Sequence, residues 1–271
     1  MLKDFISDQL VLGLAQAGVA ALAALIVVLL ARRRKIHLER DAIVAMLRGI
    51  VQIVAMGSIL LLLLRGPRWT SVFLLMGMMV AAGATSARRA KGMPDAFRVS
   101  TWAIACGAGS VIAVMTWAGV IDTAITALVP IGSMLIANAM NTNGLALNRF
   151  RSDVLSHTGE IETALALGAE ANTSVSPYVQ ASCEASLIPA IDSLRSLGIV
   201  WIPGLMAGML LSGSRPIYAA IYQFVTIAMI LASSALTALI CSLLIRGSAF
   251  SPAEQLTLRP RTRTATAVAR S

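Results

Sequence analysis

The sequence predicts an all-α integral membrane protein with about seven transmembrane helices, and two observations carry this prediction. Apolar residues (A, V, I, L, M, F, W, Y and C) make up 57% of the 271 positions and charged residues only 13%, against about 25% charged in soluble domains. The apolar residues are also gathered into long runs, and a hydrocarbon core about 30 Å thick needs about 20 apolar residues of helix. We therefore expect most of the chain to lie in a bilayer.

The expected spans follow one another along most of the chain. The first is not expected to be a cleavable signal, because Lys3 is outweighed by Asp4 and Asp8 and the apolar run is too long for a signal peptide. The predicted spans are residues 9–31, 42–64, 70–87, 99–121, 123–147, 196–213 and 216–245.

The basic residues cluster at the ends of apolar runs, which predicts the orientation of the chain. Cytoplasmic loops of membrane proteins are enriched in Lys and Arg. With the predicted spans, the clusters after the first, third, fifth and last spans fall on one side, and Lys3, Arg65, Arg68 and Arg215 fall on the other. The sequence thus predicts an outside N-terminus and a cytoplasmic C-terminus. The net charge of +9 then reports orientation rather than nucleic-acid binding.

The chain is expected to consist of one membrane domain and a short tail. The transmembrane domain covers residues 1–247 and includes one polar cytoplasmic loop, residues 148–195. Residues 248–271 are rich in Thr and Arg and contain Pro252 and Pro260, so they cannot bury enough apolar surface to fold alone. We expect a disordered, basic cytoplasmic tail there.

Polar residues inside spans point to a substrate pathway, because such groups are costly in a bilayer. Arg48 lies inside the second span with Gln52 one helical turn later, either along a pathway or with Arg48 reaching the cytoplasmic interface. The Pro130 to Asn143 segment is rich in amides and small residues, which fits close helix packing or a pathway. The residues assigned to the pathway are Arg48, Gln52, Met134, Asn138, Met140, Pro203, Gly204, Met206, Gly208 and Gln223.

Two features of this set have alternative readings. Gly204 and Gly208 form a GxxxG spacing that suits a close helix crossing, while Pro203 before them suits a broken helix that lines a cavity. Methionine thioethers are soft metal ligands, but scattered Met residues more often fill a core. His37 and His157 both fall in loops, so no histidine site is expected in the membrane. A metal route would need sulfur and amide or carbonyl oxygen, and whether such a site exists is not decided by the sequence.

Several motifs are missing from the sequence. It contains no G-x-x-x-x-G-K-[ST] phosphate loop, no Asp or Glu deep in a predicted span and no G-x-S-x-G motif. We therefore expect no catalytic residues and no directly bound cofactor. ATP would act through a partner subunit, since carboxylates that commonly couple ion gradients to transport are missing from the spans.

The polar loop is expected to contain a short helix. Thr158 is a candidate N-cap, and Glu160 and Glu162 suit the positive end of a helix dipole. Ile161, Ala164, Leu165 and Gly168 fall at helical spacing and form an apolar stripe. Such a stripe either lies on the membrane surface or docks in a groove of a cytoplasmic partner.

A resemblance to a known family rests on motifs in this loop and around it. Glu162 to Ala169 resembles the E-x-x-x-x-L-G-A coupling segment of the FetB-type iron-export ABC permeases, which are related to plant aluminium-tolerance permeases. Further similarity runs from about residue 40 to 245: Arg48 with Gln52 and Gly57, Val129-Pro130-Ile131, Asn138-Ala139-Met140, Leu187-Ile188-Pro189 with Asp192, and Pro203 to Gly208.

The resemblance implies a permease subunit of an ABC transporter in the bacterial inner membrane. It implies a separate ATP-binding partner, a homodimer of the permease, and export of iron or another metal. An organic substrate such as a nucleotide sugar is the alternative within the family, and a non-ABC channel or membrane scaffold is the alternative outside it. The implied contacts with the ATPase are Glu162, Ala164, Leu165, Leu167, Gly168 and Ala169.

The sequence also departs from the family pattern. Ser133 and Ala137 stand where the pattern has Gly, and Glu170-Ala171 stands where Thr-Pro would start the next helix. Ser176-Pro177 is then expected to supply a later start, because proline suits the first helical position. Gln180 and Glu184 occupy positions that tend to be basic in the family.

Overall fold

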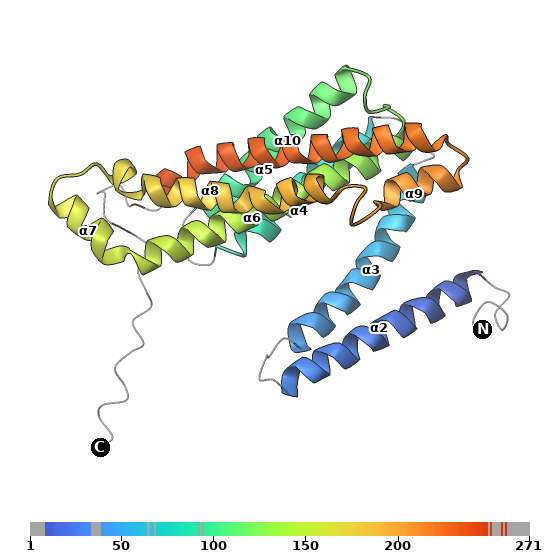
Figure 1. Cartoon of the computed structure of the whole chain (residues 1–271), viewed down its shortest axis with the longest axis horizontal. Coiled ribbons are helices and arrows are strands. Elements are labelled where there is room, and N and C mark those ends of the chain that lie inside the picture. The colour runs from blue at the N-terminus through green and yellow to red at the C-terminus, as the bar shows by residue number, and fades with distance from the viewer. Residues whose placement is uncertain are drawn as a thin grey trace. The chain divides into compact units, whose positions relative to one another are not determined.

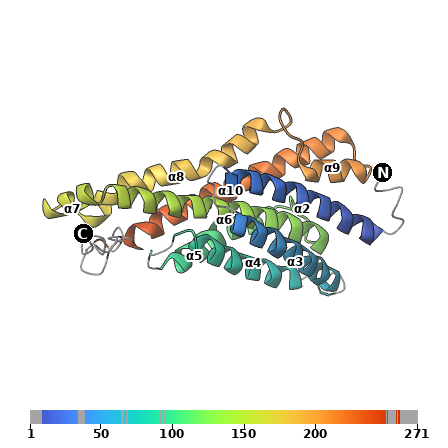
Figure 2. The ribbon, with the colours of Figure 1, turned by 90° about the horizontal axis from the view of Figure 1, so that it is seen from below.

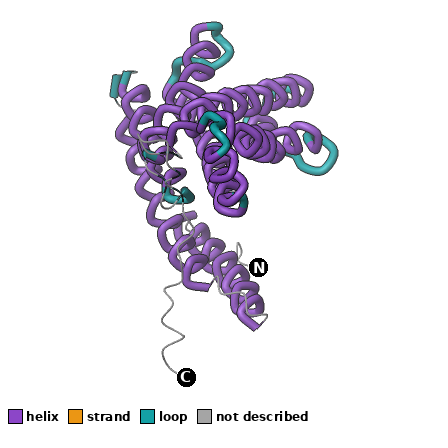
Figure 3. The backbone as a smooth tube through the Cα atoms, turned by 90° about the vertical axis from the view of Figure 1, so that its left-hand side faces the viewer, coloured by secondary structure: helices purple, strands orange, loops and turns teal. Residues whose placement is uncertain are grey.

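A computed structural model describes residues 9–33, 39–63, 66–67, 69–90, 93, 95–248, 250, 256 and 258. These residues form helices joined by short loops (Figure 3), and among them strand pairing is limited to two isolated bridges. The predicted all-α class is therefore confirmed. The chain divides into two compact units, residues 1–66 and 67–271.

The first unit is a pair of apolar helices. Helices α2 (Gln9–Arg33) and α3 (Glu39–Leu63) contact each other, and Figure 1 shows them side by side and running in opposite directions. None of their described side chains is buried. A helix that is apolar on every face is found in a membrane or in a large core. The surface of this pair is therefore suited to contact lipid or other membrane helices.

The second unit is a bundle in which α10 is central. Helix α10 packs against α5, α6 and α8, while α4 packs against α5 and α6. Figure 2 shows α6 and α8 running side by side along the bundle. The helices are α4 (Thr70–Ala87), α5 (Ala96–Trp117), α6 (Ile125–Ser156), α7 (Thr158–Ala166), α8 (Ala171–Ser196), α9 (Gly204–Leu211) and α10 (Pro216–Ser248).

Two glycines allow the closest helix contacts of this bundle. A Cβ atom at Gly83 on α4 would collide with Thr101 on α5, and one at Gly107 on α5 would collide with Thr237 on α10. Small residues let helix backbones approach closely. The resulting van der Waals contacts hold helices together in lipid, where the hydrophobic effect does not drive their association. These two positions therefore hold α4, α5 and α10 together.

Most predicted spans coincide with helices. Five helices are long and apolar enough to cross a bilayer, and Ala15–Leu30 is a shorter apolar helix. The span predicted at 196–213 is not one continuous helix, because α8 ends at Ser196, a turn follows, and α9 has only eight residues, about 12 Å. Gly198 at φ +76° and Pro203, the residue before α9, break the helix there. The long spans are Ala42–Leu60, Thr70–Ala87, Ala96–Trp117, Ile125–Ser156 and Pro216–Gly247.

The predicted polar loop 148–195 is almost entirely helical. Helix α6 has 32 residues, about 48 Å, and so extends about 18 Å beyond a hydrocarbon core about 30 Å thick. Helix α8 returns beside it, and α7 joins them at the far end of the bundle (Figure 1). The predicted tail lies largely outside the described residues. Three of its residues are described, and they pack against the cluster around Phe150: Phe250, Leu256 and Leu258.

Candidate functional site

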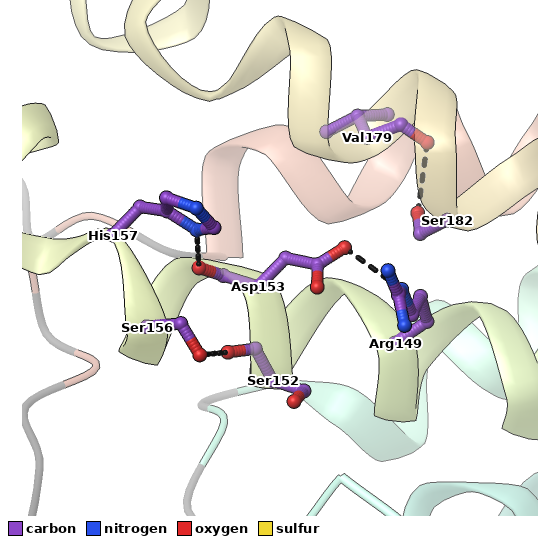
Figure 4. Close-up of polar contacts among 7 residues, drawn as sticks. All are labelled: Arg149, Ser152, Asp153, Ser156, His157, Val179 and Ser182. Atoms are coloured by element: carbon purple, nitrogen blue, oxygen red, sulfur yellow. Dashed lines mark hydrogen bonds and ion pairs between the residues drawn. The ribbon is translucent and has the colours of Figure 1, made fainter.

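The tip of the bundle, where α6 meets α7, is tightly ordered by its own side chains. A single residue, His157, separates the two helices, and its Nδ1 lies 2.8 Å from the backbone oxygen of Asp153. The Asp153 carboxylate accepts a hydrogen bond from Arg149 Nε at 3.0 Å (Figure 4). Thr158 is not the N-cap that was predicted, because its hydroxyl donates to the carbonyls of Val154 and Leu155.

The N-terminal part of α8 fixes α7 from the other side. The ring of His157 stacks on that of Tyr178 at 4.9 Å between centroids. The Tyr178 hydroxyl donates to Glu160 Oε2 at 3.3 Å. Desolvation and the nearby Glu160 carboxylate raise the pKa of Tyr178 above its ordinary value, so the phenol remains a donor. Helix α7 is thus held at a defined angle to α6 and α8.

The two faces of α7 differ sharply. Ile161 is 1% exposed and Leu165 packs against the same core, so the predicted apolar stripe faces the protein's own helices. Glu162 is exposed, and Leu167 is 84% exposed at the end of the helix. Ala164 is half-buried, and Gly168 and Ala169 are exposed, with Gly168 in a left-handed conformation at φ +89°. The side chains free to contact a partner are therefore those around Leu167.

A buried polar node lies where α4, α5 and α6 meet. Asn143 is fully buried, and its Nδ2 donates to Ser86 Oγ at 2.7 Å and Ser100 Oγ at 2.9 Å. Next to it, Arg89 Nη2 donates to Asn141 Oδ1 at 3.3 Å. The amides predicted to need partners within the bundle therefore find them on neighbouring helices. The node stabilises the bundle and lies apart from any cavity described below.

Helix α8 presents a charged face alongside the membrane helices. Leu194 packs against a cluster that includes Leu128 of α6 and Ile227 of α10, both in apolar spans. Asp192 and Arg195 lie on either side of Leu194, pair at 3.6 Å, and remain largely exposed. Charged groups at membrane depth face protein or water rather than lipid. The end of α8 thus presents an exposed ion pair beside a residue that packs on the apolar helices.

A cavity of about 300 Å³ lies beside the broken helix, between the α8–α9 turn and α10. Gln223 of α10 is 1% exposed, and its Oε1 accepts a hydrogen bond from the backbone N–H of Met206 at 3.1 Å. Its Nε2 is buried with no partner among the described residues. Pro203 is buried, and both Pro203 and Met206 also line the cavity. The break in the helix thus leaves a small space that Gln223 helps to line.

The predicted pathway residues fall into three places. Pro203, Met206 and Gln223 meet at the cavity, as a broken helix would require. Met134 and Met140 pack against the core, and Asn138 donates to the Met134 carbonyl of its own helix at 2.9 Å. Arg48 and Gln52 are exposed on α3, in the other unit, so their predicted approach to the rest stays a prediction.

Gly204 and Gly208 are both exposed, and a Cβ atom at either would meet nothing within 4 Å. The close crossing expected from their GxxxG spacing is therefore not made within the described chain. The sequence reading placed Asp192 and Arg195 in a polar cytoplasmic loop, whereas the structure places both residues in helix α8. The polar residues of this segment are spaced irregularly, so the sequence did not indicate a helix that is apolar on one side only.

Comparison with known proteins agrees with this architecture. A family model described as "Uncharacterised protein family (UPF0014)" matches residues 14–250. The "Probable iron export permease protein FetB" of Escherichia coli is 30% identical, covering 88% of this chain and 93% of its own length. The "UPF0014 membrane protein YjkA" of Bacillus subtilis is 32% identical, covering 86% and 93%. The "Protein ALUMINUM SENSITIVE 3" of Arabidopsis thaliana is 27% identical, covering 90% of each chain.

No solved structure matches the chain. The relatives confirm the resemblance to FetB-type permeases and the prediction of a multi-pass transport protein of the bacterial inner membrane. The relative from Escherichia coli is named a permease, and the one from Bacillus subtilis is named a membrane protein. The described residues contain no group of three or more His, Cys, Asp or Glu side chains that could hold a metal ion. The chain belongs to the UPF0014 family of membrane proteins.

Proposed function

We propose that this chain is the membrane-spanning subunit of an ABC transporter and that a separate ATP-binding subunit docks on its α7 tip. The observation that carries the proposal is the 84% exposure of Leu167 at the end of a helix that is otherwise fixed by its own core. A large exposed apolar side chain on a rigid projection suits insertion into a groove of another protein. Glu162 beside it offers a charge to the rim of such a groove.

The proposal requires a defined orientation in the membrane. We retain an outside N-terminus and a cytoplasmic C-terminus, with α8, the turn and α9 together forming the predicted sixth crossing. The enrichment of basic residues near the α7 end supports this assignment. A Leu167→Cys variant is then expected to react with a membrane-impermeant maleimide only after the cytoplasmic face is opened. Trp117→Cys, at the 88% exposed end of α5, is expected to react in intact cells.

The decisive experiment is ATP turnover in a reconstituted complex with the ATP-binding protein that co-purifies with the chain. Leu167→Asp is expected to lower permease-stimulated turnover at least about tenfold, since it would bury an unpaired charge at the docking site. Asn148→Asp is the control, because Asn148 is also exposed but lies on α6, outside the α7 docking surface. Leu165→Asp is unsuitable, because Leu165 packs into the core and its loss would unfold the tip.

Unchanged turnover in Leu167→Asp, with the protein still in the membrane, would rule out docking through this tip. Absence of any co-purifying ATP-binding protein would favour a channel or scaffold instead. Both rivals need no ATPase, so they predict that the exposed tip can be altered without effect on transport.

Iron or another metal is the proposed cargo, with export as the direction. The support is the relative from Escherichia coli, which is named a probable iron export permease. An organic anion such as a nucleotide sugar is the second candidate. It is favoured by the lining of the Gln223 cavity, which contains neither Asp nor Glu. Iron content of a deletion strain under iron excess distinguishes them, because only the metal exporter predicts accumulation.

We also propose that two copies of the chain assemble through the charged face of α8. Two such faces opposite each other would shield Asp192 and Arg195 from lipid and enclose a polar path between the copies. The exposure of both side chains in a single chain supports this arrangement. The partner surface is then the same helix of the second copy.

A further inference from the structure

We infer that a groove between the start of α8 and the end of α10 binds the headgroup of a zwitterionic phospholipid with a primary amine, as phosphatidylethanolamine has. The inference concerns a lipid rather than the cargo, and it does not depend on the ABC assignment. The groove has a volume of about 500 Å³, within the range of about 300–1,000 Å³ for small-molecule sites. The lining residues used below are Glu170, Thr173, Ser176, Leu243 and Arg246.

Two opposite charges line this groove without neutralising each other. Arg246 lies in the last turn of α10, and Glu170 is the residue immediately before α8. Each charge suits its own helix, since cations are stabilised near a C-terminal end and anions near an N-terminal end. Neither side chain forms an ion pair with any residue that the structure describes. The groove therefore offers one cation and one anion to a ligand.

The Arg246 guanidinium is suited to the phosphate of a headgroup. The Arg246 side chain is half-buried, and its Nε is a buried atom with no hydrogen-bond partner in the described part of the chain. An unpaired charge that is partly removed from water costs free energy, and salt screens it less than an exposed charge. Guanidinium groups also match phosphate oxygens with paired N–H donors. We therefore assign the phosphate to Arg246.

The groove also contains hydroxyl groups that the helix itself does not use. A Ser or Thr hydroxyl in a helix can donate to a carbonyl one turn earlier. The other five serines of α8 all do so: Ser174, Ser182, Ser186, Ser193 and Ser196. Ser176 and Thr173, which line the groove, make no such bond within the described residues. Their hydroxyls remain available to donate to phosphate oxygens.

The position of the groove favours a lipid over a soluble ligand. The apolar span of α10 ends at Gly247, so Arg246 lies at the end of an apolar helix, where Arg commonly meets the polar surface of a bilayer. Leu243 lies one turn earlier, is 68% exposed, and lines the same groove. Burial of such a side chain against an acyl chain is favourable.

The charges of the groove select the type of headgroup. The single positive and single negative charge cancel, so a zwitterion complements them better than a headgroup with net negative charge. The Glu170 carboxylate accepts hydrogen bonds, which a primary ammonium can donate. A trimethylammonium group has no N–H to donate. The geometry of charges therefore favours phosphatidylethanolamine over both phosphatidylglycerol and phosphatidylcholine.

The test compares these three lipids, with identical acyl chains, for binding to the full-length chain in detergent by native mass spectrometry. We expect phosphatidylethanolamine to bind at least about threefold more tightly than either of the others. The preference is modest because Glu170 is exposed and water weakens exposed ion pairs. Equal binding of all three would overturn the inference. Displacement of the lipid by soluble phosphoethanolamine at the same concentration would overturn the assignment to a lipid.

Two variants separate the two charges of the groove. Glu170→Gln should abolish the preference for phosphatidylethanolamine over phosphatidylglycerol without weakening the binding of phosphatidylglycerol, because only the anion is removed. Arg246→Gln should weaken binding of all three lipids about tenfold, because a charged hydrogen bond to phosphate is lost. The controls are Glu184→Gln, exposed on α8, and Arg151→Gln, half-buried on α6. Neither residue lines the groove, so both variants should bind lipid as the unaltered chain does.

A control that loses as much as its matched variant would mean that general surface charge attracts the lipid, which would overturn the site. A Glu170→Gln variant that keeps the full preference would do the same. If Arg246→Gln does not fold, the double variant Thr173→Val with Ser176→Ala tests the phosphate contact instead. It should weaken binding of all three lipids about threefold, and unchanged binding would contradict the site.

Discussion

Asn143 donates both hydrogens of its amide to hydroxyl groups on other helices, Ser86 of α4 and Ser100 of α5. In lipid there is no water to replace these bonds, so one side chain fixes the relative heights of three helices. Its Oδ1 is buried without a partner among the described residues. A single residue thus carries two stabilising bonds and one unsatisfied acceptor.

Asn143→Leu is therefore expected to lower the free energy of unfolding by about 1–3 kcal/mol, because two buried hydroxyls lose their donor. Unfolding in mixed micelles, followed by circular dichroism as the denaturing detergent is increased, gives this quantity. Asn148→Leu on the exposed side of the same helix is expected to change it by about 0.5 kcal/mol or less. Equal losses in the two variants would mean that the node contributes no stability of its own.

At the scale of elements, the sequence predicted most of the helices but misjudged which glycines join them. Apolar run length locates a membrane helix, because the bilayer sets that length. Whether a glycine faces another helix depends on tertiary packing, which no short motif encodes. The GxxxG pair Gly204 and Gly208 meets nothing, whereas Gly107 and Gly83 meet threonines on neighbouring helices.

Glycine substitutions make this difference measurable. Gly107→Ala is expected to destabilise the fold by about 1–3 kcal/mol, because its new Cβ would press on the backbone of Thr237 and push α5 from α10. Gly208→Ala and Gly77→Ala place the same methyl group in open space. Because alanine favours helix over glycine, those two should be neutral or stabilising. The free energy of unfolding in mixed micelles is the measurement, and a similar loss in all three variants would contradict the packing.

The α8 segment shows the second limit of the sequence. Its polar residues suggested a soluble loop with a late helix start at Ser176-Pro177, yet the helix begins at Ala171 and contains Pro177. The family pattern places a helix start at the same position, where this chain has Glu170-Ala171. The Gln223 cavity was predictable in part, since Pro203 and Gln223 were both assigned to a pathway. Their meeting depends on how far α8 extends before it breaks, which the sequence alone did not reveal.

At the scale of the whole molecule, a helix with ions exposed beside membrane spans needs a partner. Asp192 and Arg195 are largely exposed in the single chain, and Leu194 between them packs against side chains of the apolar helices α6 and α10. Exposure of both charges to lipid would cost about 2.5–3.5 kcal/mol each on insertion scales. A second copy that covers the same face of α8 removes this cost and gives the assembly a two-fold axis.

A cysteine on the same face should therefore cross-link two copies. Ile188 is 54% exposed on α8, close to Asp192, so Ile188→Cys is expected to form a disulfide dimer in native membranes under a mild oxidant. Cys106 and Cys183 are replaced by serine first, and Cys241 stays because it is buried. Val114→Cys on α5 has a matching exposure of 55% and should remain monomeric on a non-reducing gel. A dimer in the α5 variant with none in the α8 variant would move the interface to the other side of the bundle, leaving Asp192 and Arg195 to be shielded by some other partner.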